Sequence, residues 1–196
     1  MLYHLDVDLD YRRLGPDRDR VLPVEWDRTR ELRAKGVILI AYRKASAQGV
    51  IEVWDCPSHD AVREHLMSMP LYPYFTQVRL TPLIALPAFT GEDPAARSAP
   101  ANPCQLDVDI EYGRIGAERD RLLAEERERS KALLAQGIML SGYRRADARG
   151  VIAFWDCPSN DELRDTVLGM PLAPYFSALR LTPLTVHPIF KTTPAA

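Results

Sequence analysis

The chain has 196 residues, of which 46% are hydrophobic and 27% are charged, and its formal net charge is −2. This length suits one or two small domains, and the near-neutral charge favours neither a nucleic-acid partner nor an anionic membrane surface. No apolar run approaches the roughly 18 residues that span a bilayer, and the N-terminus lacks the apolar core of a signal peptide, so a cytoplasmic protein is expected.

The first predicted elements are a strand and a helix. The stretch HLDVDLDY alternates apolar and charged residues with period two, which is typical of a strand with one buried face. An amphipathic helix is expected from about 17 to 35, and Gly36 is placed to cap its end. Pro23 suits a first turn better than a helix interior, so the regular helix is expected to begin near Leu22.

A hairpin, a second helix and a last strand follow in the chain. GVILIAYR and GVIEVWD are mostly apolar runs joined by a short turn that contains Gly49, and they predict two strands of a hairpin. PSHDAVREHLMSM predicts a helix with Ser58 as its cap, and Pro70 stops it. TQVRLTPLIAL then predicts a strand, so the order of elements is βαββαβ.

The whole pattern occurs twice in the chain. GVIEVWDCPS returns as GVIAFWDCPS and MPLYPYF as MPLAPYF, at a constant offset of 101 residues, as between Cys56 and Cys157. A fixed internal offset indicates a structural repeat. We therefore predict a first repeat in residues 1–89, a Pro- and Ala-rich linker in 90–103, a second repeat in 104–190 and a short tail in 191–196.

The order βαββαβ is the ferredoxin-like arrangement, in which both helices cover one face of the sheet. Residues 37–41 are apolar on both sides of their strand, so the other face must be covered as well. The sheet of the second repeat is the expected cover. The predicted fold class is α+β: two tandem ferredoxin-like βαββαβ repeats that form an intramolecular pseudo-dimeric α+β barrel.

Each first helix carries a glutamate beside its buried stripe. Glu25 shares a helix face with Leu22 and Leu32, and Glu126 has the same place in the second repeat. Burial there desolvates the carboxylate, which raises its pKa and suits it to move protons. The alternative interpretation is a glutamate at the edge of the stripe that pairs with Arg28 or, in the second repeat, with Arg129.

The first repeat keeps polar residues that the second has lost. Glu52 lies on the same strand face as Trp54, which would make it a second partly buried carboxylate, and its counterpart is Ala153. Tyr72 is likewise replaced by Ala173. The first repeat is therefore expected to hold the working site.

One strand face gathers His4, Asp6 and Asp8. A histidine beside acidic groups can act as an acid, although a hydrogen-bonding role is the alternative. The two aspartates could bind a cation, but ion pairs with arginines at the interface between the repeats are favoured. The three cysteines have no metal-ligand spacing, so no metal site is expected.

Several segments together carry a family resemblance. MLYHLDVDL at the start, the glutamate-bearing first helix, VWDCPS before the second helix and above all MPLYPYF resemble muconolactone isomerase. That family consists of small, cofactor-independent, ferredoxin-like subunits that isomerise an unsaturated lactone and assemble into larger rings. Related members dehalogenate chlorinated lactones or act in natural-product pathways. The resemblance implies a catalytic role for Glu25, no cofactor and a homo-oligomer.

The predicted function is that of a cofactor-independent isomerase, or a cyclase or dehydratase, which shifts protons on a small unsaturated lactone or polyketide-like substrate. A natural-product or aromatic-degradation pathway is expected. The alternatives are a cofactor-free monooxygenase of the α+β barrel type and a non-catalytic binding or scaffold protein. The candidate catalytic residues are Glu25, Glu52, His4 and Glu126, and the candidate substrate-binding residues are Trp26, Arg43, Trp54, Tyr72 and Tyr74.

Overall fold

The computed structural model describes residues 1–86 and 100–190. Most of the predicted linker and the whole predicted tail lie outside the described residues. The chain divides into two compact units: unit 1 is Met1–Leu83 with Thr185–Ala196, and unit 2 is Ile84–Leu184. Each unit is described by itself, and the repeat boundaries drawn from the sequence stay a prediction.

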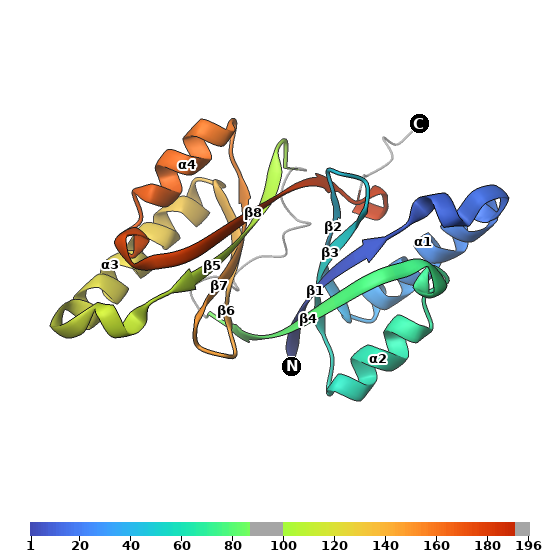
Figure 1. Ribbon diagram of the computed structural model, residues 1–196, viewed down its shortest axis with the longest axis horizontal. Helices are drawn as coiled ribbons and strands as arrows, with labels where there is room; N and C mark the ends of the chain where they lie inside the picture. Colours follow the sequence, from blue (N-terminus) through green and yellow to red (C-terminus); the bar gives the residue numbers. More distant parts are fainter. Residues whose placement is uncertain (87–99, 191–196) are drawn as a thin grey trace. The chain divides into compact units, whose positions relative to one another are not determined.

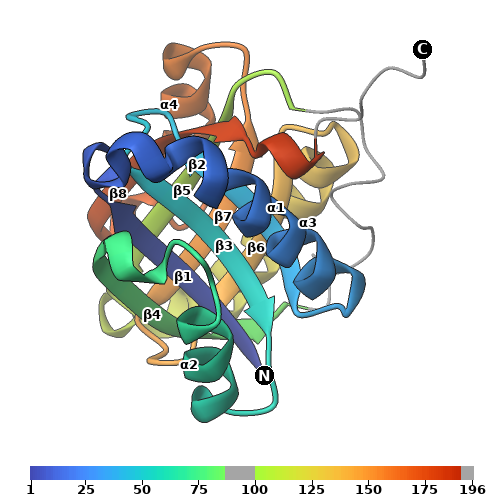
Figure 2. The same ribbon diagram turned by 90° about the vertical axis from the view of Figure 1, so that its right-hand side faces the viewer.

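Unit 1 has the predicted order of elements (Figure 1). Its strands and helices are β1 (Leu2–Leu9), α1 (Arg18–Ala34), β2 (Ile38–Lys44), β3 (Gly49–Asp55), α2 (His59–Met67) and most of β4 (Phe75–Ala85). The strands follow the order β4-β1-β3-β2, and all neighbours are antiparallel. Figure 2 shows α1 and α2 on the same face of this sheet, as the ferredoxin-like arrangement requires.

Unit 2 repeats that order. It contains β5 (Pro103–Ile110), α3 (Arg119–Ala135), β6 (Met139–Arg145), β7 (Gly150–Asp156), α4 (Asn160–Leu168) and most of β8 (Phe176–Val186). Its strands follow the order β8-β5-β7-β6. Unit 1 also includes the last two residues of β8 and the short 3-10 helix η8 (Pro188–Phe190). Residues near the end of the chain therefore belong to the same unit as the first repeat.

Helix α1 occupies the range of about 17 to 35 that the sequence predicts. It begins at Arg18 and continues through Pro23, so the expected regular start near Leu22 is wrong. Pro23 has no N–H to donate to the carbonyl of Asp19, but both residues are exposed and that carbonyl can bond to water. The helix ends at Ala34, and Gly36, with a φ of 72°, closes the turn after it as predicted.

The two shorter helices are capped by serines. Ser58 Oγ accepts a hydrogen bond from the N–H of Ala61 at 3.2 Å, and Ser159 Oγ accepts one from Glu162 at the same distance. These caps satisfy donors that the first turn leaves without a partner, which confirms the predicted helix starts.

The aspartates of β1 form ion pairs within unit 1. Lys44 contacts both Asp6 and Asp8, and Arg79 lies 2.8 Å from Asp6 and 3.2 Å from Asp8. Burial alone would raise the pKa of Asp6, but hydrogen bonds from Lys44 and Arg79 outweigh it and hold that pKa below its usual value. The prediction that these aspartates form ion pairs is confirmed. The prediction that their partners are arginines at the interface between the repeats is wrong, because the partners are Lys44 and Arg79 of unit 1.

Two further features concern the described residues alone. No group of three or more His, Cys, Asp or Glu side chains among them is arranged to hold a metal ion. None of their helices is long and apolar enough to cross a membrane.

Candidate functional site

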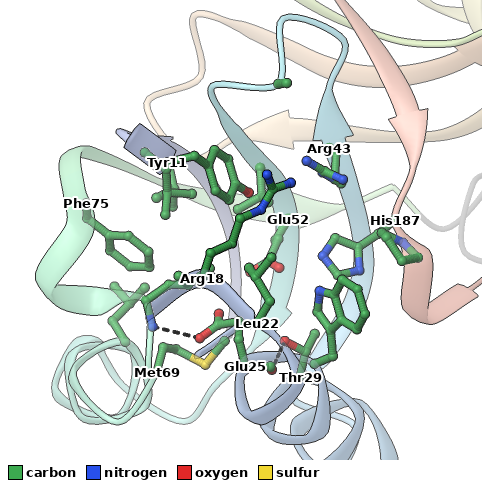
Figure 3. Close-up of a pocket in the computed structure, with 18 of the residues that line it drawn as sticks. Tyr11, Arg18, Leu22, Glu25, Thr29, Arg43, Glu52, Met69, Phe75 and His187 are labelled. Atoms are coloured by element: carbon green, nitrogen blue, oxygen red, sulfur yellow. Dashed lines mark hydrogen bonds between the residues drawn. The ribbon is translucent and has the colours of Figure 1, made fainter. Parts of the chain in front are cut away.

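Unit 1 contains a cavity of about 320 Å³ beneath helix α1 (Figure 3). Its floor comes from β1 and β3, one wall from α1, and the opposite wall from the segment after α2. The end of the chain, at His187 and Pro188, closes another side. Apolar side chains line most of it, and the polar groups are few, which is typical of a small-molecule site.

Glu25 projects from α1 into this cavity and is only 7% exposed. Its Oε2 atom accepts a hydrogen bond from the backbone N–H of Leu71 at 2.8 Å. Burial raises the pKa of Glu25 to about 7, although the bond from Leu71 favours the ionised form. Arg28 pairs instead with Glu31 at 2.6 Å, so the alternative of a Glu25–Arg28 pair is wrong.

Glu52 reaches the same cavity from β3 and is 5% exposed. Trp54 lies two residues further along the strand and donates its Nε1–H to Glu52 Oε2 at 2.7 Å. Burial raises the pKa of Glu52 to about 8; the bond from Trp54 opposes this shift, and the nearby charge of Glu25 adds to it. The cavity thus holds two carboxyl groups that titrate close to neutral pH.

Cationic and aromatic groups lie near the two carboxyl groups. Arg18 and Arg43 line the cavity, and the guanidinium of Arg43 lies 5.7 Å from the centre of the Tyr11 ring. Burial raises the pKa of Tyr11, with Arg43 acting against the shift and Glu25 adding to it. The arginines are the groups of this cavity that can bind a substrate anion.

His187 adds a neutral imidazole to the cavity. It is 6% exposed, and its pKa is lowered to about 4 because burial and the positive charges of Arg43 and Arg30 disfavour the imidazolium. At neutral pH this side chain can therefore donate one hydrogen bond and accept another. The prediction from sequence missed His187. The sequence feature that could have indicated it is the difference between the repeats at this position, where the first repeat has Leu86.

The structure gathers most of the predicted residues at one place. Five of them line the unit 1 cavity: Glu25, Trp26, Arg43, Glu52 and Trp54. Tyr11, Arg18, Thr29 and His187 also line it and were not among the predicted site residues.

Three predicted residues of the first repeat do not line this cavity. His4 is buried on β1, one position from Leu5 and therefore on the other face of the sheet. Tyr72 is 41% exposed and stacks edge-on against Phe75, and Tyr74 packs partly buried against the core. The structure does not bring these three side chains to the carboxyl groups.

Glu126 lies in a separate cavity of about 220 Å³ within unit 2. Its Oε2 atom accepts a hydrogen bond from Leu172 N–H at 2.9 Å, which matches the Glu25–Leu71 bond, and burial raises its pKa. The counterparts of Glu52 and His187 are Ala153 and Leu86, so the described part of this cavity has one carboxyl group where the unit 1 cavity has two.

Comparisons with known proteins establish the family of the chain. The sequence profile of muconolactone delta-isomerase matches residues 1–88 and again residues 104–189. The chain belongs to the muconolactone delta-isomerase family. A muconolactone delta-isomerase from Cupriavidus pinatubonensis is 30% identical over 84 residues, which cover 43% of this chain and 90% of that protein. The family resemblance read from the sequence is thereby confirmed.

Solved structures confirm the fold class. A mutant chlorite dismutase from Candidatus Nitrospira defluvii has a TM-score of 0.68 and 12% identity, and the match covers 96% of this chain and 92% of that one. A proposed monooxygenase from Lactobacillus acidophilus NCFM has a TM-score of 0.53 and 11% identity, over 94% and 92%. This member of the muconolactone delta-isomerase family therefore has the α+β barrel type of fold that was predicted.

Proposed function

We propose that unit 1 is the active half of a cofactor-independent isomerase that moves a proton on a small unsaturated lactone. The observation that carries the proposal is the pair Glu25 and Glu52, two buried carboxyl groups in one small cavity with pKa values raised to about 7 and about 8. Perturbed pairs of this kind are typical of acid–base sites, and family membership supports the same reaction class.

The pKa values divide the roles between the two groups. At neutral pH about half of Glu25 is ionised, and it acts as the base, while Glu52 stays protonated and acts as an acid. Glu25 removes a proton from a carbon next to the double-bond system, and the electron pair moves toward the lactone carbonyl. The O–H of Glu52 donates to that carbonyl oxygen, and Glu25 returns the proton to a different carbon.

The neighbours of these groups fit those roles. The Trp54 N–H fixes Glu52 in one orientation, and the Leu71 N–H does the same for Glu25. Arg18 and Arg43 bind an anionic group of the substrate and so orient the ring above the base. Trp26 supplies a flat apolar wall.

The test measures the exchange of substrate protons with solvent. Muconolactone and simpler unsaturated γ-lactones are incubated with the protein in D₂O, and proton NMR monitors both deuterium uptake and isomerisation. We expect Glu25→Gln to slow deuterium uptake and isomerisation by about 10²–10⁴-fold, because it removes the base while keeping the hydrogen bond from Leu71. Glu126→Gln is the matched control, since Glu126 makes the same backbone contact in unit 2. Equal effects of the two substitutions, or none from Glu25→Gln, would contradict the proposal.

Assays on the same purified protein distinguish the alternative functions. A cofactor-free monooxygenase would consume oxygen with an electron-rich aromatic substrate, whereas an isomerase would not. A binding or scaffold protein would bind a lactone without any proton exchange. A cyclase or dehydratase would use the same carboxyl pair and would be recognised by its product. The cytoplasmic location, the homo-oligomer and the pathway stay predictions.

A further inference from the structure

The cavity of unit 2 differs in character from that of unit 1. Its volume is about 220 Å³, compared with about 320 Å³ for the unit 1 cavity. Leucine, valine, isoleucine and methionine side chains make up much of its lining, and Leu86 and Ala153 stand where the unit 1 cavity has His187 and Glu52. Such a lining favours a small ligand with an apolar body.

One residue of the lining carries a buried polar group that has no acceptor among the described residues. Trp155 lines the cavity and is 2% exposed, and its Nε1 atom has no hydrogen-bond partner there. In unit 1 the matching Trp54 donates to Glu52, whose place is taken in unit 2 by Ala153. A buried N–H without an acceptor is destabilising, so a ligand that brings an acceptor to it should bind more tightly than an apolar group of the same shape.

Positive charge borders the same cavity. Arg119, Arg127 and Arg144 line it and are exposed, and the guanidinium of Arg119 lies 5.8 Å from the centre of the Tyr112 ring. Among the described residues of the lining, Glu126 carries the only carboxyl group, and burial raises its pKa. The exposed side of the cavity therefore favours an organic anion.

We propose that unit 2 has a second binding site, for a small oxo-acid whose carboxylate pairs with the arginines and whose carbonyl accepts from Trp155 Nε1–H. The apolar part of the acid fills the space between these two ends. Among the described residues of this site, Ala153 stands where unit 1 has the second carboxyl group. This inference does not depend on the reaction proposed for unit 1.

The test is an NMR titration of the full ¹⁵N-labelled chain with two matched acids. One probe is 4-oxo-4-phenylbutanoate, and the control is 4-phenylbutanoate, which lacks the ketone. The chain has three tryptophans, and Trp155→Phe identifies the indole cross-peak of Trp155. We expect the oxo-acid to shift this cross-peak and to bind about tenfold more tightly than the control, since only it supplies the acceptor.

Two outcomes of the titration would overturn the proposal. Equal affinities for the two acids, or no movement of the Trp155 cross-peak at millimolar concentration, would show that the indole N–H selects nothing. Movement of only the Trp26 and Trp54 cross-peaks would place the acid in unit 1 instead.

Two variants check the role of the N–H independently. Ala153→Glu gives Trp155 the acceptor that Trp54 already has in Glu52, so the tenfold preference should disappear. Trp155→Phe removes the donor and should leave the affinity for 4-phenylbutanoate within about twofold while abolishing the preference. Retention of the preference in either folded variant contradicts the assignment.

Discussion

Two glutamates with the same local contact have different chemical surroundings. Glu25 and Glu126 lie on matching helices, and each accepts a hydrogen bond from a backbone N–H of the segment after the next helix. Among the described residues, only Glu25 shares its cavity with a second carboxyl group, because Glu52 is replaced by Ala153 in unit 2. One residue thus decides which cavity can use both a base and an acid.

The pH dependence of the reaction follows from these two groups. The active form has Glu25 ionised and Glu52 protonated, so kcat/KM should rise through a pKa of about 7 and fall through one of about 8. Glu52→Gln keeps an acceptor for the Trp54 N–H but cannot ionise, so it should abolish the alkaline fall and keep the acidic rise. Steady-state kinetics between pH 5 and 10 measure both limbs. An alkaline limb that survives in Glu52→Gln would contradict the assignment.

At the scale of an element, the repeated segment MPLYPYF contacts Glu25, the proposed base, through its backbone. A short 3-10 helix, η2 (Tyr72–Tyr74), follows Leu71, whose N–H donates to Glu25. The exchange of Tyr72 for Ala173 had pointed to the tyrosine ring as a functional group. The structure places that ring partly in solvent, outside the lining of the cavity.

The end of α1 supplies a prediction on stability. Gly36 has a φ of 72°, and an added Cβ would meet no atom within 4 Å, so Gly36→Ala costs only backbone strain, about 1 kcal/mol of unfolding free energy. Urea unfolding with an unchanged m value measures this loss. Gly113→Ala is the control, since Gly113 lacks a positive φ, has open space and matches Arg12 of the first repeat. Equal losses in both variants would show that the left-handed turn is not the cause.

At the scale of the whole molecule, the unit 1 site uses residues from both ends of the chain. Glu25 and Glu52 come from the first repeat, while His187 belongs to the second repeat in sequence and to unit 1 in the structure. A chain with one repeat would lack this imidazole. Duplication within one chain also allows the two cavities to differ, as the exchanges at 52 and 187 show.

The buried carboxyl groups also make the stability of the molecule depend on pH. Their pKa values are higher in the folded state than the ordinary value of 4.5, so the folded state binds more protons between pH 4.5 and about 8. Their contribution is fully present below pH 4.5 and is lost as pH rises through about 7 and 8, by about 3 kcal/mol for Glu25. The free energy of unfolding should therefore differ between the wild type and the double variant Glu25→Gln, Glu52→Gln, and this difference should change between pH 5 and 9. A constant difference would contradict the raised pKa values.

The sequence by itself determined the order of the elements, the duplication and the burial of Glu25. These features depend on periodicity, capping residues and internal repetition, which are local and can be read from neighbours along the chain. Only the tertiary structure decided that Glu52 faces Glu25, that the Leu71 N–H holds the carboxylate, and that His187 closes the cavity. These contacts join residues that are distant in sequence, so no local pattern specifies them. For the same reason the structure separates His4 and Tyr72 from the carboxyl pair, although both had looked functional beside their neighbours in the chain.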